Sequence, residues 1–268
     1  MRINHNLSAM NTHRQLSIND TNSSKSMEKL SSGYRINRAA DDAAGLSISE
    51  KMRAQIKSLT QGSRNTQDGI SLAQTAEGAL TEVSDMLTRA KELAVQASSG
   101  TYNTTDLAAI DAEYTELKSA IDDIATKTDF NGIKMLNAAT SIDIQFGANS
   151  GDKITITGGD MQSSAIGLTG DMTSNANAKT ELGAIDSAIE AVNTLRSSFG
   201  ALQNHMEHTQ KNLDATSENL QAAESRIRDV DMAKEMSEYT KNNILSQAAT
   251  SMLAQANQQP QNVLSLLR

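Results

Sequence analysis

Apolar residues recur at alternating steps of three and four along two long stretches of the chain, 46–97 and 182–230. Such steps place apolar side chains on one stripe of an α-helix and are typical of a coiled-coil seam. A shorter stretch with the same spacing, 107–124, follows a Ser-Ser-Gly break, and Thr104-Thr105-Asp106 is a candidate N-cap before it. We therefore predict a mainly α fold, a long antiparallel helical bundle in which the short helix folds back on the first long one.

The spacing changes between the last two of these stretches. Isoleucines alternate with polar residues on both sides of an Asn149-Ser150-Gly151 turn, which predicts a β-hairpin over about residues 141–157. The next segment, 158–180, is rich in Gly, Thr, Ser, Asn and Asp and has little periodicity. We expect a short variable region of loops and short strands there, which would tolerate insertions.

Both ends of the chain are predicted to form amphipathic helices with polar rather than charged outer faces. Residues 242–267 include no charged residue, although Asn, Gln and Ser are abundant. A helix exposed to water normally carries charge on its outer face, so we expect these helices to be buried against other copies or a partner. The residues of this self-assembly stripe are Leu7, Met10, Ile244, Ala248, Met252 and Leu253.

The composition suits long helices. The 268 residues include a single proline, Pro260, which lies near the end of the last predicted helix; average usage would give about a dozen. Three Phe, four Tyr and no Trp leave the core to aliphatic residues. The absence of cysteine excludes disulfides, thiolate metal sites and a cysteine nucleophile.

The charge distribution argues against nucleic-acid binding. The net charge is −8: residues 46–223 hold 13 Lys and Arg against 23 Asp and Glu, the two ends are nearly neutral, and no basic stripe is present for phosphate contacts. The sequence has no stretch of about 18 apolar residues, so it predicts no membrane span. The N-terminus lacks an apolar run of signal-peptide length, so we expect any export to use a route other than a Sec-type signal.

No motif predicts catalysis, a cofactor or a metal. His205 and His208 flank Met206 on a helix, but the arrangement is not H-E-x-x-H, and we expect both imidazoles at the edges of the seam or in solvent. No serine stands in a G-x-S-x-G motif. We therefore expect a protein that is not an enzyme.

Two carboxylate pairs have better structural than catalytic interpretations. Asp41-Asp42 and the pair Asp229 and Asp231 lack the loop spacing of a calcium site, so we expect charges at helix ends or ion pairs between helices.

The segment around Arg89 is open to two interpretations. Leu93 lies off the main apolar stripe and is expected to be exposed, on either a solvated face or a contact surface.

Several motifs resemble those of the bacterial flagellins. They are the segment Leu30–Leu46 (LSSGYRINRAADDAAGL), the segments Thr66–Ser71 and Thr75–Leu80, the segment Glu224–Met236 (ESRIRDVDMAKEM) and the ending Met252–Arg268. Because several long motifs occur in the family's order at both ends, the resemblance is specific. It covers about residues 1–157 and 180–268.

The resemblance implies a structural subunit of the flagellar filament. Family members are exported unfolded through the flagellar type III apparatus, bound by an export chaperone at the C-terminal end, and polymerised outside the cell beneath a filament cap, on hook-junction proteins. By resemblance, residues 1–44 and 225–268 form a filament-core domain whose helices pair as a coiled coil. Residues 45–224 form an outer helical bundle with the hairpin, without the further outer domains of many flagellins.

Flagellins are also ligands of a Toll-like receptor of the innate immune system. The receptor-contact motif resembles the segment 89–95, so Arg89, Leu93 and Glu113 are the receptor-contact residues that the resemblance implies. An arginine and an exposed leucine flanked by charge suit an interface. In the family this surface is covered in the filament, which implies that monomers are recognised.

Two alternatives remain. A hook–filament junction protein has similar ends, but its C-terminal signature differs from the segment 224–268. A flagellin with a protease in its central insert is disfavoured by the short segment 158–180 and the missing H-E-x-x-H motif.

Overall fold

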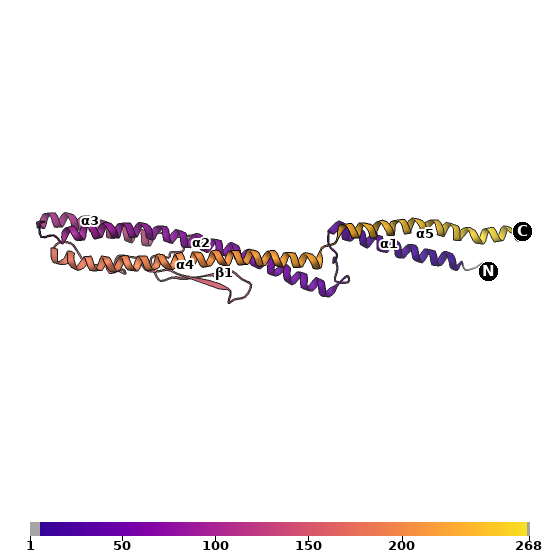
Figure 1. Cartoon of the computed structure of the whole chain (residues 1–268), viewed down its shortest axis with the longest axis horizontal. Coiled ribbons are helices and arrows are strands. Elements are labelled where there is room, and N and C mark those ends of the chain that lie inside the picture. The colour runs from indigo at the N-terminus through magenta and orange to yellow at the C-terminus, as the bar shows by residue number, and fades with distance from the viewer. Residues whose placement is uncertain (1–5, 267–268) are drawn as a thin grey trace. The chain divides into compact units, whose positions relative to one another are not determined.

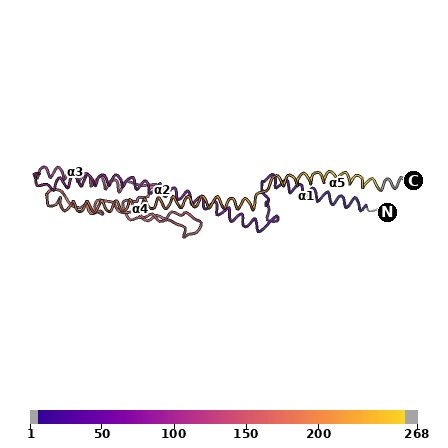
Figure 2. Tube along the Cα trace, viewed as in Figure 1, coloured from indigo at the N-terminus to yellow at the C-terminus, as the bar shows by residue number. Residues whose placement is uncertain are grey.

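A computed structural model describes residues 6–266, with side chains up to residue 259. Five helices and one two-stranded antiparallel sheet make up this part of the chain (Figures 1 and 2). The elements are α1 (Leu7–Ser32), α2 (Ala43–Ala97), α3 (Thr104–Lys127), β1 (Ser141–Gln145), β2 (Lys153–Thr157), α4 (Asn175–Arg228) and α5 (Met232–Leu266). The predicted mainly α fold with a small hairpin is confirmed, and α5 continues past Pro260.

The chain divides into two compact units. Met1–Ala54 and Asn219–Arg268 form one, called the terminal unit below, and Gln55–Glu218 forms the other, the central unit. Helices α2 and α4 contribute residues to both. The predicted domain boundaries after residues 44 and 224 fall inside these two helices, and their role as limits of a filament-core domain stays a prediction.

In the central unit α2 and α4 lie antiparallel, as the two long seams predict. Lys91 Nζ lies 2.6 Å from Asp186 Oδ1, and Ser63 Oγ donates to Asp214 Oδ1 at 3.0 Å. Residue numbers rise along α2 from Ser63 to Lys91 while those of their partners on α4 fall, so the two helices run in opposite directions. Figure 1 shows α3 beside the same two helices.

The core of the central unit follows the predicted seams. Leu80, Leu87, Phe199 and Met206 are among its fully buried side chains. Within the predicted seams 46–97 and 182–230, Ile48 and Thr216 lie at the three-and-four spacing, but both are exposed, so these two positions of the prediction are wrong. Helix α3, with 24 residues, is shorter than the 55-residue α2 and can cover only part of it.

The cap of α3 differs from the prediction by one residue. Asn103, rather than the segment after it, is the N-cap: its Oδ1 accepts from the Asp106 N–H at 2.8 Å. Asp106 accepts in return from the Asn103 N–H, which completes a capping box. The helix begins at Thr104 because Asn103 satisfies one of its free N–H groups.

The hairpin forms as predicted. Ile142 pairs with Ile156 and Ile144 with Ile154, and the two isoleucines of β2 are buried. The hairpin approaches α2 closely at Gly62, where a Cβ would overlap the carbonyl oxygen of the residue after β1. Glycine at this position therefore lets the hairpin pack on α2.

The predicted variable region is shorter and more buried than expected. Helix α4 begins at Asn175, and residues 158–174 contain no strand. Backbone N–H groups here bond to α3 instead of forming a ladder: Ser163 N donates to Asp122 Oδ1 at 2.6 Å and Met172 N to Asp111 Oδ1 at 2.7 Å. The apolar side chains that anchor the segment in the core are Met161, Ile166, Leu168 and Met172.

None of the described helices combines the length and the hydropathy that crossing a lipid bilayer requires.

Candidate functional site

Helices α1 and α5 pair antiparallel within the terminal unit. Asn6 Nδ2 donates to the Ala256 carbonyl oxygen at 2.8 Å, and Ser246 Oγ donates to Asp20 Oδ1 at 2.7 Å. Figure 1 shows the indigo α1 beside the yellow α5. The predicted pairing of the terminal helices is therefore confirmed.

The side chains between α1 and α5 are mostly small or polar. The positions that are buried or half-buried at steps of three and four are Ala9, Thr12, Leu16, Asn19, Ser23, Ser26 and Leu30 in α1, and Glu235, Tyr239, Asn242, Ser246, Ala249, Leu253 and Ala256 in α5. A coiled-coil seam normally carries large apolar residues at these positions. This seam buries little apolar surface, so it contributes little to pairing.

The large apolar side chains of these helices face outward instead. Leu7, Met10, Ile244 and Met252 are 64%, 63%, 60% and 62% exposed, and Ala248 is also exposed. Five of the six predicted stripe residues are thus exposed. The sixth, Leu253, is half-buried and belongs to the seam with α1.

The same two helices expose further large apolar side chains besides the six stripe residues. They are Ile18, Met27, Met232, Met236 and Leu245. Ile18 stands between Ser17 and Asn19, and Met232 follows Asp231, so neither extends an apolar run in the sequence. We call these five and the exposed stripe residues Leu7, Met10, Ile244, Ala248 and Met252 the terminal apolar face; the name groups them by exposure, since Met232 and Met252 lie on different sides of α5.

The two signature segments that carry the family resemblance meet in the terminal unit. Tyr34 forms a backbone bridge with Asp229, and the Arg35 N–H donates to the Arg228 carbonyl oxygen at 2.6 Å. The Arg228 guanidinium lies 4.7 Å from the centre of the Tyr34 ring and also pairs with Glu50 at 2.6 Å. This contact fixes the connection that follows α1 against the connection that precedes α5.

Arg89 and Glu113 form an exposed ion pair between α2 and α3. Arg89 Nη2 lies 2.8 Å from Glu113 Oε1, and Arg89 Nη1 lies 2.9 Å from Glu92 Oε2. The bonds to Glu92 and then Glu113 raise the pKa of the Arg89 guanidinium above its usual value. The structure therefore brings together two of the three predicted receptor residues on one surface.

The expected exposure of Leu93 is wrong. Its side chain is 2% exposed and belongs to the same core cluster as Leu107 and Ile110. Leu93 lies one helical turn after Arg89, on the side of α2 that Glu113 and α3 cover. A residue off the main stripe is buried because α2 contacts α3 on one side and α4 on another.

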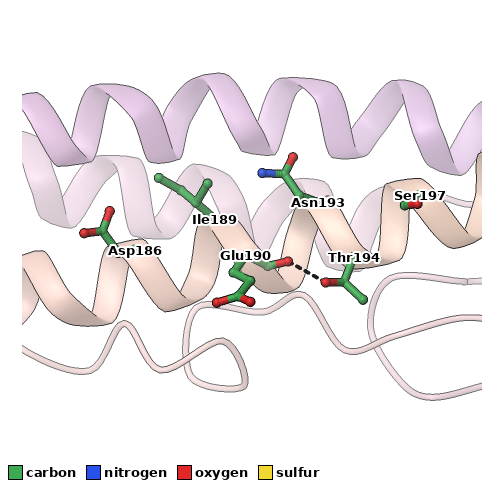
Figure 3. Close-up of a pocket in the computed structure, with 6 residues that line it drawn as sticks. All are labelled: Asp186, Ile189, Glu190, Asn193, Thr194 and Ser197. Carbon is green, nitrogen blue, oxygen red and sulfur yellow. Dashed lines mark hydrogen bonds between the residues drawn. The ribbon is translucent and has the colours of Figure 1, made fainter.

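A shallow groove runs along α4. Figure 3 shows its lining residues Asp186, Ile189, Glu190, Asn193, Thr194 and Ser197. The side chains follow one helix rather than converging on a point, and Thr194 Oγ1 donates to the Glu190 carbonyl oxygen at 2.8 Å. The groove thus lacks the convergent polar groups of a catalytic pocket.

A buried polar pair that the sequence did not reveal joins α3 to α4. The Tyr114 hydroxyl donates to Glu181 Oε1 at 2.5 Å, and both side chains are buried. Burial, and then the bond to Glu181, raises the pKa of Tyr114. Lys118 lies 4.6 Å from the centre of the Tyr114 ring and donates to the Gly170 carbonyl oxygen at 2.8 Å, which ties the loop before α4 to α3.

The predicted carboxylate pairs lie at helix ends. Asp42 Oδ1 accepts from the Gly45 N–H at 2.8 Å at the start of α2. Asp231 Oδ1 accepts from the Ala233 N–H at 3.0 Å at the start of α5. These bonds confirm the helix-terminal interpretation.

The two histidines are placed as expected. His205 and His208 are exposed on α4, whereas Met206 between them is buried in the seam.

Two protein-family models match the chain. The bacterial flagellin N-terminal helical region matches residues 3–141, and the bacterial flagellin C-terminal helical region matches residues 182–267. Among solved structures, a crystal structure of Bacillus cereus flagellin has a TM-score of 0.53 and 38% sequence identity, covering 60% of this chain and 94% of that one.

Full-length relatives agree with these matches. A flagellin of Halalkalibacterium halodurans is 57% identical over 272 residues, and a flagellin of Bacillus subtilis is 51% identical over 304 residues. Each alignment covers the whole of both chains. The chain therefore belongs to the bacterial flagellins and is a structural subunit of the flagellar filament, not an enzyme.

Proposed function

We propose that the chain polymerises by burying the terminal apolar face against neighbouring copies. The observation that carries this proposal is the distribution of side chains on α1 and α5. Small or polar residues lie between the two helices, whereas Leu7, Met10, Ile244 and Met252 are more than half exposed. Full burial of one such side chain is worth roughly 1.5–3 kcal/mol. Single exposed apolar residues are common, but a set on one helix pair is typical of an interaction surface.

The same arrangement makes the order of the terminal unit depend on its neighbours. Fixing the backbone of one residue costs roughly 1–2 kcal/mol, and the polar α1–α5 seam returns little of it. Contact with other copies buries the terminal apolar face and offsets this cost. Polymerisation and ordering of the terminal helices are then one process.

Removal of residues 242–268 should abolish filament formation. A sharper test combines Ile244→Gln with Met252→Gln, because it keeps the helix and removes only exposed apolar surface. We expect the critical concentration for seeded polymerisation to rise at least about tenfold. Gln255→Ala, at an exposed polar position of α5, is the matched control and should polymerise normally.

Filament formation at the normal rate by the shortened chain or by the double variant would contradict the proposal. Electron microscopy of the seeded samples separates true filaments from amorphous aggregates.

We also propose that a Toll-like receptor of the host recognises the monomer through Arg89 and Glu113. Their exposed, bonded side chains support a polar contact surface that spans α2 and α3. Leu93 supports this surface from beneath, because its burial holds α3 on α2. Arg89→Ala should lower signalling in receptor-bearing reporter cells by at least about tenfold. Arg64→Ala, another exposed arginine of α2, should leave it unchanged; equal signalling by both variants would contradict the assignment.

Family membership supports a further proposal, about export and assembly partners. We propose that the chain leaves the cell through the flagellar type III apparatus, with an export chaperone on its C-terminal end, and adds beneath a filament cap onto hook-junction proteins. The exposed apolar side chains of α5 support a chaperone contact before assembly, because they need cover in the cytoplasm. Removal of residues 242–268 should therefore also abolish co-purification with the chaperone.

A further inference from the structure

The methionines of α1 and α5 differ in exposure from the other methionines that the structure describes. Five are exposed to between 49% and 63%, and all five lie on α1 or α5. They are Met10, Met27, Met232, Met236 and Met252. Each belongs to the terminal apolar face, so methionine supplies about half of that surface.

The methionines elsewhere are buried or half-buried. Met135, Met161, Met172 and Met206 of the central unit are at most 7% exposed. Met52 and Met86, the remaining two that the structure describes, are half-buried. An oxidant in solution therefore reaches the sulfur atoms of the terminal apolar face before those of the core.

We propose that these five methionines are an oxidation site that controls assembly of the monomer. A hydroperoxide transfers one oxygen atom to the thioether sulfur, which loses two electrons and becomes a sulfoxide, while the peroxide is reduced to water or an alcohol. The sulfoxide is polar, whereas the thioether it replaces is a flexible apolar group. This inference rests on the proposed burial of the terminal apolar face during polymerisation.

The consequence differs between monomer and filament. A sulfoxide at Met10 or Met252 must enter an apolar contact without a hydrogen-bond partner, which lowers affinity on the order of tenfold for each such group. In the filament the same sulfur atoms are covered, so oxidation is slow. Oxidised monomers are thereby kept from the growing end, and assembled subunits are protected.

The test compares the full chain with a variant in which the five exposed methionines are leucine. Leucine is close to methionine in volume and apolar character but cannot form a sulfoxide. The matched control is Met52→Leu with Met86→Leu, which keeps all five exposed sulfur atoms. Monomers are treated with hydrogen peroxide, mapped by peptide mass spectrometry, and added to filament seeds.

We expect sulfoxide at the five positions first and at least a tenfold loss of seeded polymerisation by the unsubstituted chain and the control. The five-leucine variant should polymerise equally before and after peroxide. A methionine sulfoxide reductase should restore polymerisation of the oxidised unsubstituted chain. Loss of polymerisation by the peroxide-treated five-leucine variant, or equal oxidation of core methionines in the folded monomer, would overturn the inference.

The proposed function is tested separately in the same samples. If the terminal apolar face is not buried in filaments, its methionines will oxidise in filaments as fast as in monomers. That result would refute the proposed function, whatever oxidation does to the monomer.

Discussion

Leu93→Ala should destabilise the central unit, because Leu93 is a core residue and not a surface contact. The side chain is 2% exposed, within the cluster that includes Leu107 and Ile110 of α3. Truncation to alanine removes three buried carbon atoms between α2 and α3. The neighbouring helices are long and packed on several sides, so the site cannot collapse to fill the space.

The magnitude follows from the burial. About 0.8 kcal/mol for each buried CH2 gives about 2.4 kcal/mol for the three carbons lost. The cavity left behind adds to this value, as it does in core leucines generally. We expect the free energy of unfolding to fall by about 3 kcal/mol.

Urea unfolding of the monomer, followed by circular dichroism, measures this loss. Val95→Ala is the control: Val95 lies two residues further along α2 and is 55% exposed, so its free energy of unfolding should change by less than about 0.5 kcal/mol. A loss below about 1 kcal/mol for Leu93→Ala would refute the burial argument. Loss of receptor signalling at full stability would instead make Leu93 a direct contact.

Three further changes test other parts of the structure. Asn19→Leu replaces a buried polar seam residue and should strengthen the α1–α5 pair, seen as higher helicity of the monomer by circular dichroism; lower helicity would contradict the polar-seam argument. Tyr114→Phe leaves the Glu181 carboxylate without its hydroxyl donor and should cost about 1–3 kcal/mol in urea unfolding, whereas Tyr102→Phe should be near neutral. Bonds from Lys153 and then Thr155 lower the pKa of the Asp143 carboxyl below its usual value. These bonds therefore stabilise the folded chain above about pH 4, and this stabilisation is lost as the pH falls through the folded-state pKa of Asp143. The stability gap between the unsubstituted chain and Asp143→Asn should therefore close at low pH in urea titrations, and a gap that persists would contradict this origin.

Local periodicity was sufficient to predict the elements and much of the core. Leu80 and Phe199 lie on stripes that a single helix defines, and the structure buries both. The hairpin is likewise local, because alternation and a short turn set the pairing of Ile144 with Ile154.

The burial of α2 residues by an element other than α4 could not be predicted from the periodicity of α2. Leu72 and Leu93 lie off the main stripe of α2 and are nevertheless buried. The segment around Phe130 lies against Leu72, and α3 covers Leu93. Tertiary contacts of this kind leave no periodic signal in the helix itself.

The terminal apolar face was predicted only in part, for a related reason. Hydrophobicity alone does not say which side of α5 meets α1. The structure selects Ala249 and Ala256 for that side, because small residues let two helices approach closely, and leaves Ile244 and Met252 outside. The apolar stripe in the sequence therefore marks a surface that stays exposed in the monomer more than the surface that pairs α1 with α5.

Amide hydrogen exchange of α1 and α5, measured in the monomer and in the filament, tests the central claim most directly. The polar seam predicts fast exchange along both helices in the monomer and strong protection in the filament, because order comes with burial of the terminal apolar face. Helices of the central unit, such as α3, should be protected in both states. Equal protection of α1 and α5 in monomer and filament would contradict the account.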